Sequence, residues 1–148
     1  MIRQLMFLGG ICLLIALGSA DAWAKEAIGS VKALKGDVQI ERDGITVPAV
    51  AGGLIYTSDT LKTAENGAIG LILRDDTLTS MGPDSVLVLK EYLFEPKESR
   101  YSMILGFLKG TFVYQSGVIG KLAPEAIHLE TPDSTIAVRG TRLLVKVN

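Results

Sequence analysis

The stretch "AIGLILRDDTLTSMGPDSVLVLK", residues 68–90, decides the fold class of this chain. Its apolar runs are separated by two groups of turn-forming residues, Arg74-Asp75-Asp76 and Gly82-Pro83-Asp84. Short apolar runs bounded by Gly, Pro and Asp are typical of β-strands joined by tight turns. The strands predicted here are 68–73, 77–81 and 85–90.

Two of these runs are apolar at consecutive positions: 69–73, apart from Gly70, and 86–89. A strand with one solvated face alternates between apolar and polar residues, so a continuous apolar run indicates that both faces are covered. Two explanations are open. Either a second layer packs on each side of these strands, or one of their faces meets a partner.

The same pattern continues through the rest of the chain. Further turn signals are Lys35-Gly36-Asp37, Asp43-Gly44 and Asn66-Gly67, and Asp-Gly between alternating runs is the strongest short-range hairpin signal. The segment 91–102 is rich in charge and contains Pro96, which predicts a surface loop or excursion rather than a linker between domains. About a dozen short strands with no sustained helical period predict an all-β fold: a twisted solenoid-like stack, a roll or a sandwich.

The first 24 residues predict a helical secretory signal peptide. Arg3 precedes the apolar run 5–20, and Ala22-Trp23-Ala24 supplies small residues where a signal peptidase cuts, so cleavage is expected before Lys25. An uncleaved membrane anchor is the alternative, although the apolar run is shorter than the ~20 residues that span a bilayer as a helix. The mature protein is therefore expected in the periplasm or outside the cell, with no membrane span.

Cleavage leaves residues 25–148, enough for one β domain with its own core. Cys12, the one cysteine of the chain, is lost with the signal peptide, so neither a disulfide nor a thiolate metal site is expected. The formal net charge of −1 supplies no strong field to attract nucleic acid.

The sequence predicts no enzyme, no metal site and no cofactor. His128 is the one histidine, and no G-x-S-x-G motif is present. The one adjacent pair of carboxylates, Asp75-Asp76, is explained by its turn, because Asp tolerates left-handed backbone and bonds to its own main chain there. The other acids fall at turns and in 91–98, which is typical of solvated surface rather than of a catalytic cleft.

Four segments together resemble the FecR domain, the extracytoplasmic domain of regulators of iron-siderophore uptake and of many secreted bacterial proteins. The most specific parts are Asp59-Thr60-Leu61-Lys62-Thr63, the Gly-bearing strand 108–112, and the motif Thr131-Pro132 … Arg139-Gly140-Thr141. The four segments are "GSVKALKGDVQIERDG" (29–44), "AGGLIYTSDTLKTAENGAIGLILRDDTLTSMGPDSVLVL" (51–89), "LKGTFVY" (108–114) and "ETPDSTIAVRGTRLLVKV" (130–147).

The resemblance implies a β-rich module that binds other extracytoplasmic proteins, but the chain departs from the family in three ways. Asp75-Asp76 replaces the usual Asp-Gly turn, and the chain stops at Asn148, where relatives commonly continue. A signal peptide also stands where regulators of this type carry a cytoplasmic segment and a membrane helix. The role of those regulators in acting on a sigma factor is therefore not expected to transfer.

The Arg-Gly-Thr motif is predicted to be structural rather than ligand-binding. Gly140 is expected at a bend, where the side chains of Arg139 and Thr141 would satisfy open backbone carbonyls. The strand after the motif is predicted to be an exposed edge that accepts a partner's strand. The residues of this partner-facing edge are Leu143, Val145 and Val147.

Three functions follow from these expectations. The first is a secreted, non-enzymatic binding or scaffold module, whose partner is an envelope protein, bound by strand addition or through an apolar face, or a cell-wall glycan. The alternative is a sensor that acts in trans in envelope signal transduction of the iron-uptake type. The third, which the sequence favours least, is an enzyme acting on an envelope polymer, and it predicts a cleft lined by paired carboxylates.

Overall fold

The computed structural model describes residues 25–140 and 142–148, so the predicted signal peptide (1–24) and Thr141 lie outside the described residues. The predicted all-β fold is confirmed. The short helices are η1 (Pro96–Glu98), α1 (Val118–Leu122) and η2 (Pro124–Ala126). The strands are β1 (Gly29–Lys35), β2 (Val38–Arg42), β3 (Ile45–Pro48), β4 (Leu54–Ile55), β5 (Thr60–Thr63), β6 (Ala68–Leu73), β7 (Leu78–Met81), β8 (Val86–Glu95), β9 (Arg100–Gln115), β10 (Ile127–Glu130), β11 (Thr135–Ala137) and β12 (Arg142–Val147).

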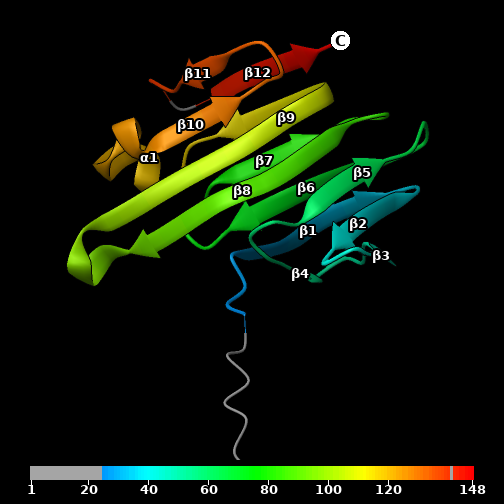
Figure 1. The fold of residues 1–148 in the computed structure, drawn as a ribbon, viewed down its shortest axis with the longest axis horizontal. Helices are drawn as coiled ribbons and strands as arrows, with labels where there is room; N and C mark the ends of the chain where they lie inside the picture. Colours follow the sequence, from blue (N-terminus) through cyan, green and yellow to red (C-terminus); the bar gives the residue numbers. More distant parts are fainter. Residues whose placement is uncertain (1–24, 141) are drawn as a thin grey trace, which may run out of the picture.

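The 16-residue strand β9 organises the fold, because its two halves belong to two different layers. Its first half lies between β8 and β10, and its second half between β7 and β12. We call the layer β4-β1-β6-β7-β9-β12 sheet A and the layer β3-β2-β5-β8-β9-β10-β11 sheet B. The continuous sheet curls so that β8 and the first half of β9 lie in front of β6 and β7 in Figure 1.

Gly110 marks the place where β9 passes from one sheet to the other. Its φ of 103° lies in the region that favours glycine, and the register with β8 shifts nearby. Phe107 and Phe112, five positions apart, are both fully buried, and their rings stack with centroids 4.5 Å apart. The irregularity therefore changes the alternation of the strand, so that both halves direct their aromatic side chains into one core.

That core lies between the two sheets. In the run 69–73, the side chains of Ile69, Leu71 and Leu73 point inward, while Gly70 and Ile72 lie on the outer face of sheet A and are half-buried. No other element of the described residues pairs with or covers that outer face. The first explanation for the continuous apolar run was a second layer packed on each side of the strand. The described residues supply such a layer on the inner side only.

The segment 91–102, predicted to be a surface loop or excursion, is an excursion formed by strands and not a loop. Strand β8 continues to Glu95 and β9 begins at Arg100, so this segment forms the outer part of a long hairpin closed by η1. Pro96 opens η1, a position where its missing N–H is not needed. The rings of Phe94 and Tyr101 lie 6.1 Å apart across the two strands, and this cross-strand aromatic contact outweighs the local rise in charge.

Candidate functional site

The buried carboxylate of Asp75 is a structural junction. Its oxygens accept hydrogen bonds from Thr77 Oγ1 at 2.8 Å, the Tyr92 hydroxyl at 3.0 Å and the Ile119 backbone N–H at 3.1 Å. These bonds tie the β6–β7 turn to β8 and α1. Burial, and then the charge of Asp75, raise the pKa of the Tyr92 hydroxyl above its ordinary value. The acceptor capacity of this carboxylate is used inside the fold.

The second fully buried carboxylate, Asp59, is neutralised by Arg42. Arg42 donates to it from Nε at 2.9 Å and from Nη2 at 2.7 Å, and the Tyr56 backbone N–H donates at 2.9 Å. The guanidinium also lies 4.6 Å from the centroid of the Tyr56 ring. Asp59 begins the segment 59–63, and its carboxylate ties Arg42 on β2 to the turn between β4 and β5.

The remaining candidates for chemistry among the described residues are metal-binding clusters and His128. No group of three or more His, Cys, Asp or Glu side chains is close enough there to hold a metal ion. His128 is exposed on the outer face of sheet B, opposite Ile104 and Ala137. The two buried carboxylates do not face a shared cleft, because each is enclosed by its own hydrogen-bond donors.

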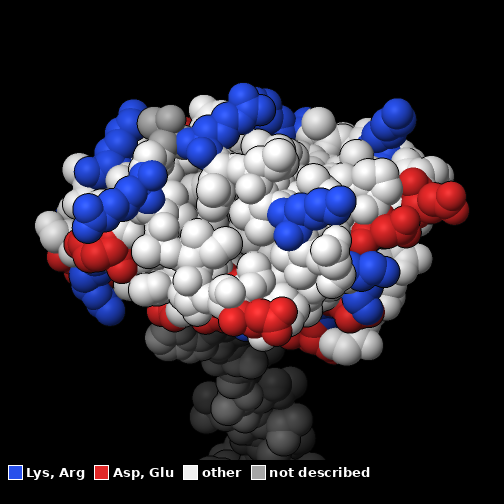
Figure 2. All heavy atoms as spheres, turned by 90° about the horizontal axis from the view of Figure 1, so that it is seen from above, with Lys and Arg blue, Asp and Glu red and all other residues white. Residues whose placement is uncertain are grey.

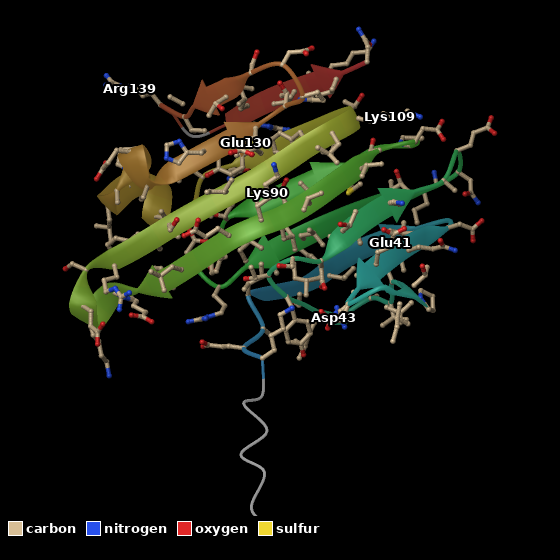
Figure 3. All side chains as sticks on the ribbon, in the orientation of Figure 1. Glu41, Asp43, Lys90, Lys109, Glu130 and Arg139 are labelled. Carbon is tan, nitrogen blue, oxygen red and sulfur yellow. The ribbon has the colours of Figure 1, made fainter. Side chains whose placement is uncertain are left out.

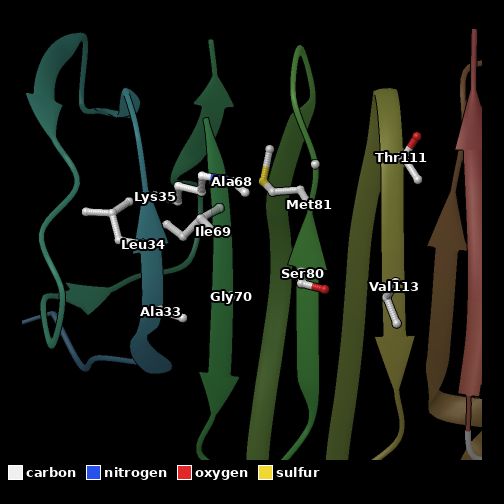
Figure 4. Close-up of a pocket in the computed structure, with 11 residues that line it drawn as sticks. Ala33, Leu34, Lys35, Ala68, Ile69, Gly70, Ser80, Met81, Thr111 and Val113 are labelled. Atoms are coloured by element: carbon white, nitrogen blue, oxygen red, sulfur yellow. The ribbon is translucent and has the colours of Figure 1, made fainter. Parts of the chain in front are cut away.

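The most distinctive surface is a trough across the outer face of sheet A. We define the trough by one row of outward residues that the strand register aligns on β1, β6, β7, β9 and β12. A hollow of about 460 Å³ opens over its first four members, which lie on neighbouring strands in Figure 4. The five residues are Ala33, Gly70, Ser80, Val113 and Leu144.

Four cations surround this trough. Lys32 and Lys35 lie beside its β1 end, and Arg142 and Lys146 lie on β12 on either side of Leu144. All four are exposed, and none forms an ion pair within residues 25–140 and 142–148. No carboxylate occurs among the outward residues that the register places on these five strands.

The outer face of sheet B differs in its charge. Lys62 pairs with Glu41 at 2.6 Å, and Lys90 pairs with Glu130 at 2.6 Å, with the latter two side by side in Figure 3. On the face drawn in Figure 2, Lys and Arg are prominent along the upper margin, and Asp and Glu lie mainly at the lower and right margins. Sheet A therefore presents uncompensated positive charge around an apolar floor, although the net charge of the chain is only −1.

Gly70, in the floor of the trough, is not required by the packing of this chain. A Cβ added there would lie 3.7 Å from the Ala33 Cβ, an ordinary contact, and its φ is not in the glycine-favouring region. Gly inside a strand lowers stability relative to Ala through the entropy of the unfolded chain. We therefore expect Gly70→Ala to raise the free energy of unfolding by about 0.5–1 kcal/mol in urea denaturation. A loss of stability would contradict this description of the floor.

The structure places Arg139 on the surface, which differs from the expectation that its side chain satisfies open backbone carbonyls at the bend. Its side chain is exposed at the margin of the domain (Figure 3), and it has no hydrogen-bond or ion-pair partner among the described residues. Gly140 lies at a bend with φ 121°, and its carbonyl accepts a hydrogen bond from Ser116 Oγ at 3.2 Å. The bracing contact at this bend thus comes from Ser116.

We accordingly expect Arg139→Ala to change the free energy of unfolding by less than about 0.5 kcal/mol, as is usual for exposed positions without contacts. Thermal unfolding of the two proteins under the same buffer conditions measures this. A drop of about 2 kcal/mol or more, the size of a lost buried contact, would restore the role of a brace.

The other parts of the C-terminal signature are a turn and an edge strand. Thr131 closes the turn before β11, since its N–H donates to Ser134 O at 2.8 Å and its Oγ1 accepts from Ser134 N at 3.1 Å; Pro132 is exposed. Strand β12 pairs with β9 alone among the described strands, so its other edge has no partner there. The residues predicted to face a partner turn into the core instead: Leu143, Val145 and Val147.

Comparison with protein families settles the relationship of the chain. A family model described as FecR protein matches residues 59–148, more than half of the sequence. The chain belongs to the FecR family. The match begins at Asp59, yet β1 pairs with β6 over six register positions, so the segment before the match is part of the same FecR-family sheet. Comparisons with curated proteins and with solved structures gave no match.

Family membership supports a coarse functional assignment for this FecR domain. The family is a non-enzymatic signalling family that is generally associated with the cell envelope, which indicates a role related to envelope signal transduction. Among the residues that the structure describes, no helix has the length and apolar character needed to cross a membrane.

Sequence reasoning identified the motifs of this FecR domain but not its most distinctive surface. The four cations of sheet A come from β1 and β12, which are distant in sequence. The register of five strands brings them to the same face of the sheet. The one available signal was the continuous apolar run 69–73, with its open question of which faces are covered.

Proposed function

We propose that this FecR domain is an exported, non-enzymatic binding module that engages another protein of the cell envelope through the outer face of sheet A. The observation that carries the proposal is the trough with its four cations, which have no ion-pair partner among the residues that the structure describes. A protein surface rarely leaves a continuous apolar area beside uncompensated charge unless a partner covers it. The contiguous open edge of β12 gives the same partner a place to add a strand.

Signalling in trans is the second candidate. Membership in the FecR family supports it, because the family acts in envelope signal transduction. A sensor of this kind would bind a transmembrane regulator or transducer, whereas a scaffold would bind an adhesin, an autotransporter or a wall-binding protein. The neighbouring genes distinguish the sensor from the scaffold, since genes for a sigma factor and an outer-membrane transport receptor are expected beside the gene of a sensor.

Site-specific photo-cross-linking in the producing cell tests the proposal. A cross-linking amino acid replaces Leu144 on sheet A or, as a matched control, Ile45 on β3; the two side chains are 69% and 63% exposed. We expect position 144 to give one dominant adduct with an envelope protein, identified by mass spectrometry, and position 45 to give none. Adducts with glycan, or equal labelling from both positions, would contradict binding of a protein at this face.

A further inference from the structure

We propose that the trough receives an amphipathic α-helix of the partner protein, about three to four turns long, whose apolar stripe is flanked by acidic residues near both ends. This inference rests on the proposed function and names the chemistry of the partner at the same surface. The helix would lie across the strands of sheet A, with its ends near β1 and β12.

The backbone chemistry of a sheet face favours a helix over an extended segment. The main-chain groups of β1, β6, β7 and β9 are paired with their neighbours in the plane of the sheet. A segment that lies on this face finds no backbone partner there, and a covered N–H or C=O without a partner is unfavourable. A helix satisfies its own backbone and presents only side chains to the floor.

The dimensions of the trough set the length of this helix. Adjacent strands lie about 4.8 Å apart, so the four intervals from β1 to β12 span about 20 Å. A helix rises about 1.5 Å per residue, so about 13 residues cover that distance. The small residues at the middle, Gly70 and Ser80, leave the floor recessed below Leu144, which suits the convex ridge of a helix.

The absence of a packing reason for Gly70 supports close approach from outside. Glycine in a strand interior often marks a place where a ligand or another chain comes near. The space that an added Cβ would occupy contacts Ala33 at an ordinary distance, so the opening is not maintained by a steric requirement of this chain. An occupant that packs against the floor gives the glycine a function.

The positions of the four cations define the charge of the occupant. Lys32 and Lys35 lie at one end of the trough, and Arg142 and Lys146 lie on opposite sides of the other end. A helix with carboxylates on both flanks of its apolar stripe, near each end, would pair with all four. On sheet B, Lys62 and Lys90 are already paired with Glu41 and Glu130, so these two lysines are less available to the carboxylates of such a helix.

A lipid surface fits the trough less well. Leu144, the large exposed apolar side chain of the trough, lies at one end, and the floor between the ends is recessed. A flat bilayer would therefore leave the hollow of about 460 Å³ unfilled. An anionic membrane is therefore an outcome of the test rather than the expected occupant.

Fluorescence anisotropy with defined peptides tests the inference. The protein is purified from the producing cell, so that it carries whichever N-terminus results from processing there. The probe is a labelled peptide of about 14 residues, with Leu along one helical face and Glu on both flanks. Matched peptides carry Lys in place of Glu, or Pro at the centre. We expect the acidic peptide to bind, with affinity that falls as salt is raised, and both matched peptides to bind at least about tenfold more weakly.

Variants of the protein locate the binding. The double variant Arg142→Glu, Lys146→Glu reverses two exposed charges at one end of the trough. We expect it to weaken the binding of the acidic peptide about tenfold. Lys97→Glu, at the exposed tip of the long hairpin, is the matched control and should leave the affinity unchanged. Gly70→Leu fills the floor and should weaken binding independently of charge. Circular dichroism and thermal unfolding verify that each variant is folded.

Several results would overturn the inference. Equal binding of the Pro peptide would indicate an extended partner, and equal binding of the Lys peptide would remove the role of the cations. Tighter binding to phosphatidylglycerol vesicles than to the peptide would indicate a membrane, and self-association abolished by Leu144→Glu would indicate a second copy. If the adduct from position 144 persists in cells while the charge reversals leave the peptide affinity unchanged, the helix inference fails and the proposed function stands. If position 144 gives no protein adduct, the proposed function itself fails.

Discussion

Gly110→Ala is expected to lower the free energy of unfolding by about 4 kcal/mol or more, and to prevent folding if the domain is only marginally stable. Two effects add. The φ of 103° is strained for any residue with a Cβ, and the added carbon would lie 2.5 Å from Ser85 Cβ and 2.6 Å from Ser85 Cα. The second contact involves backbone, so Ser85 cannot relieve it by rotating its side chain.

The matched control for this prediction is Gly44→Ala. Gly44 also has positive φ, 77°, but no atom lies within 4 Å of the position that an added Cβ would take. Only the backbone strain of about 1 kcal/mol is therefore expected. Urea denaturation of both variants separates strain from steric exclusion. Similar losses in the two proteins would show that β9 does not need a close approach to Ser85 in order to pass between the sheets.

Asp75→Ala is expected to lower the free energy of unfolding by about 3–5 kcal/mol. The substitution removes the acceptor of four donors and leaves them without that partner in a buried site. These donors are the Thr77 N–H and Oγ1, the Tyr92 hydroxyl and the Ile119 N–H. It thereby loosens the β6–β7 turn from β8 and from α1 at once. Denaturation monitored by circular dichroism measures the loss.

Asp76→Asn is the control at the neighbouring position. Asp76 is exposed with φ 66°, a conformation that Asn adopts as readily as Asp, so a change of less than about 0.5 kcal/mol is expected. If Asp75→Ala is no more destabilising than Asp76→Asn, the hydrogen bonds around Asp75 do not hold the fold, and a functional role for this carboxylate would have to be considered.

The turns of this fold could be predicted because their chemistry is local. Asp43 and Gly44 both have positive φ and join β2 to β3, as the Asp-Gly signal predicts. The inward residues of 69–73 follow from alternation once one face is known to be the core. These features depend on a few neighbouring residues, so the sequence contains them directly.

Features that depend on distant pairing could not be predicted in the same way. The charge of 91–102 indicated a loop, but cross-strand contacts such as Phe94 with Tyr101 extend the hairpin. The five-residue helix α1 is too short to show a helical period, and the parallel pairing of β10 with β9 joins segments 24 residues apart, as in Ile127 opposite Met103. Arg139 was misplaced for a related reason, because an apolar neighbourhood in sequence did not specify which side chains turn inward.

Protection of the outer face of sheet A in the cell tests the central claim most directly. In a Cys12→Ser background, Ser80→Cys places a thiol in the trough and Thr46→Cys places one on sheet B; both positions are exposed. Maleimide labelling is measured in intact envelopes and in the purified protein. If a partner covers sheet A, Ser80→Cys reacts readily when purified and is protected in the envelope, while Thr46→Cys reacts in both. Equal reactivity of Ser80→Cys in the two settings would contradict the account.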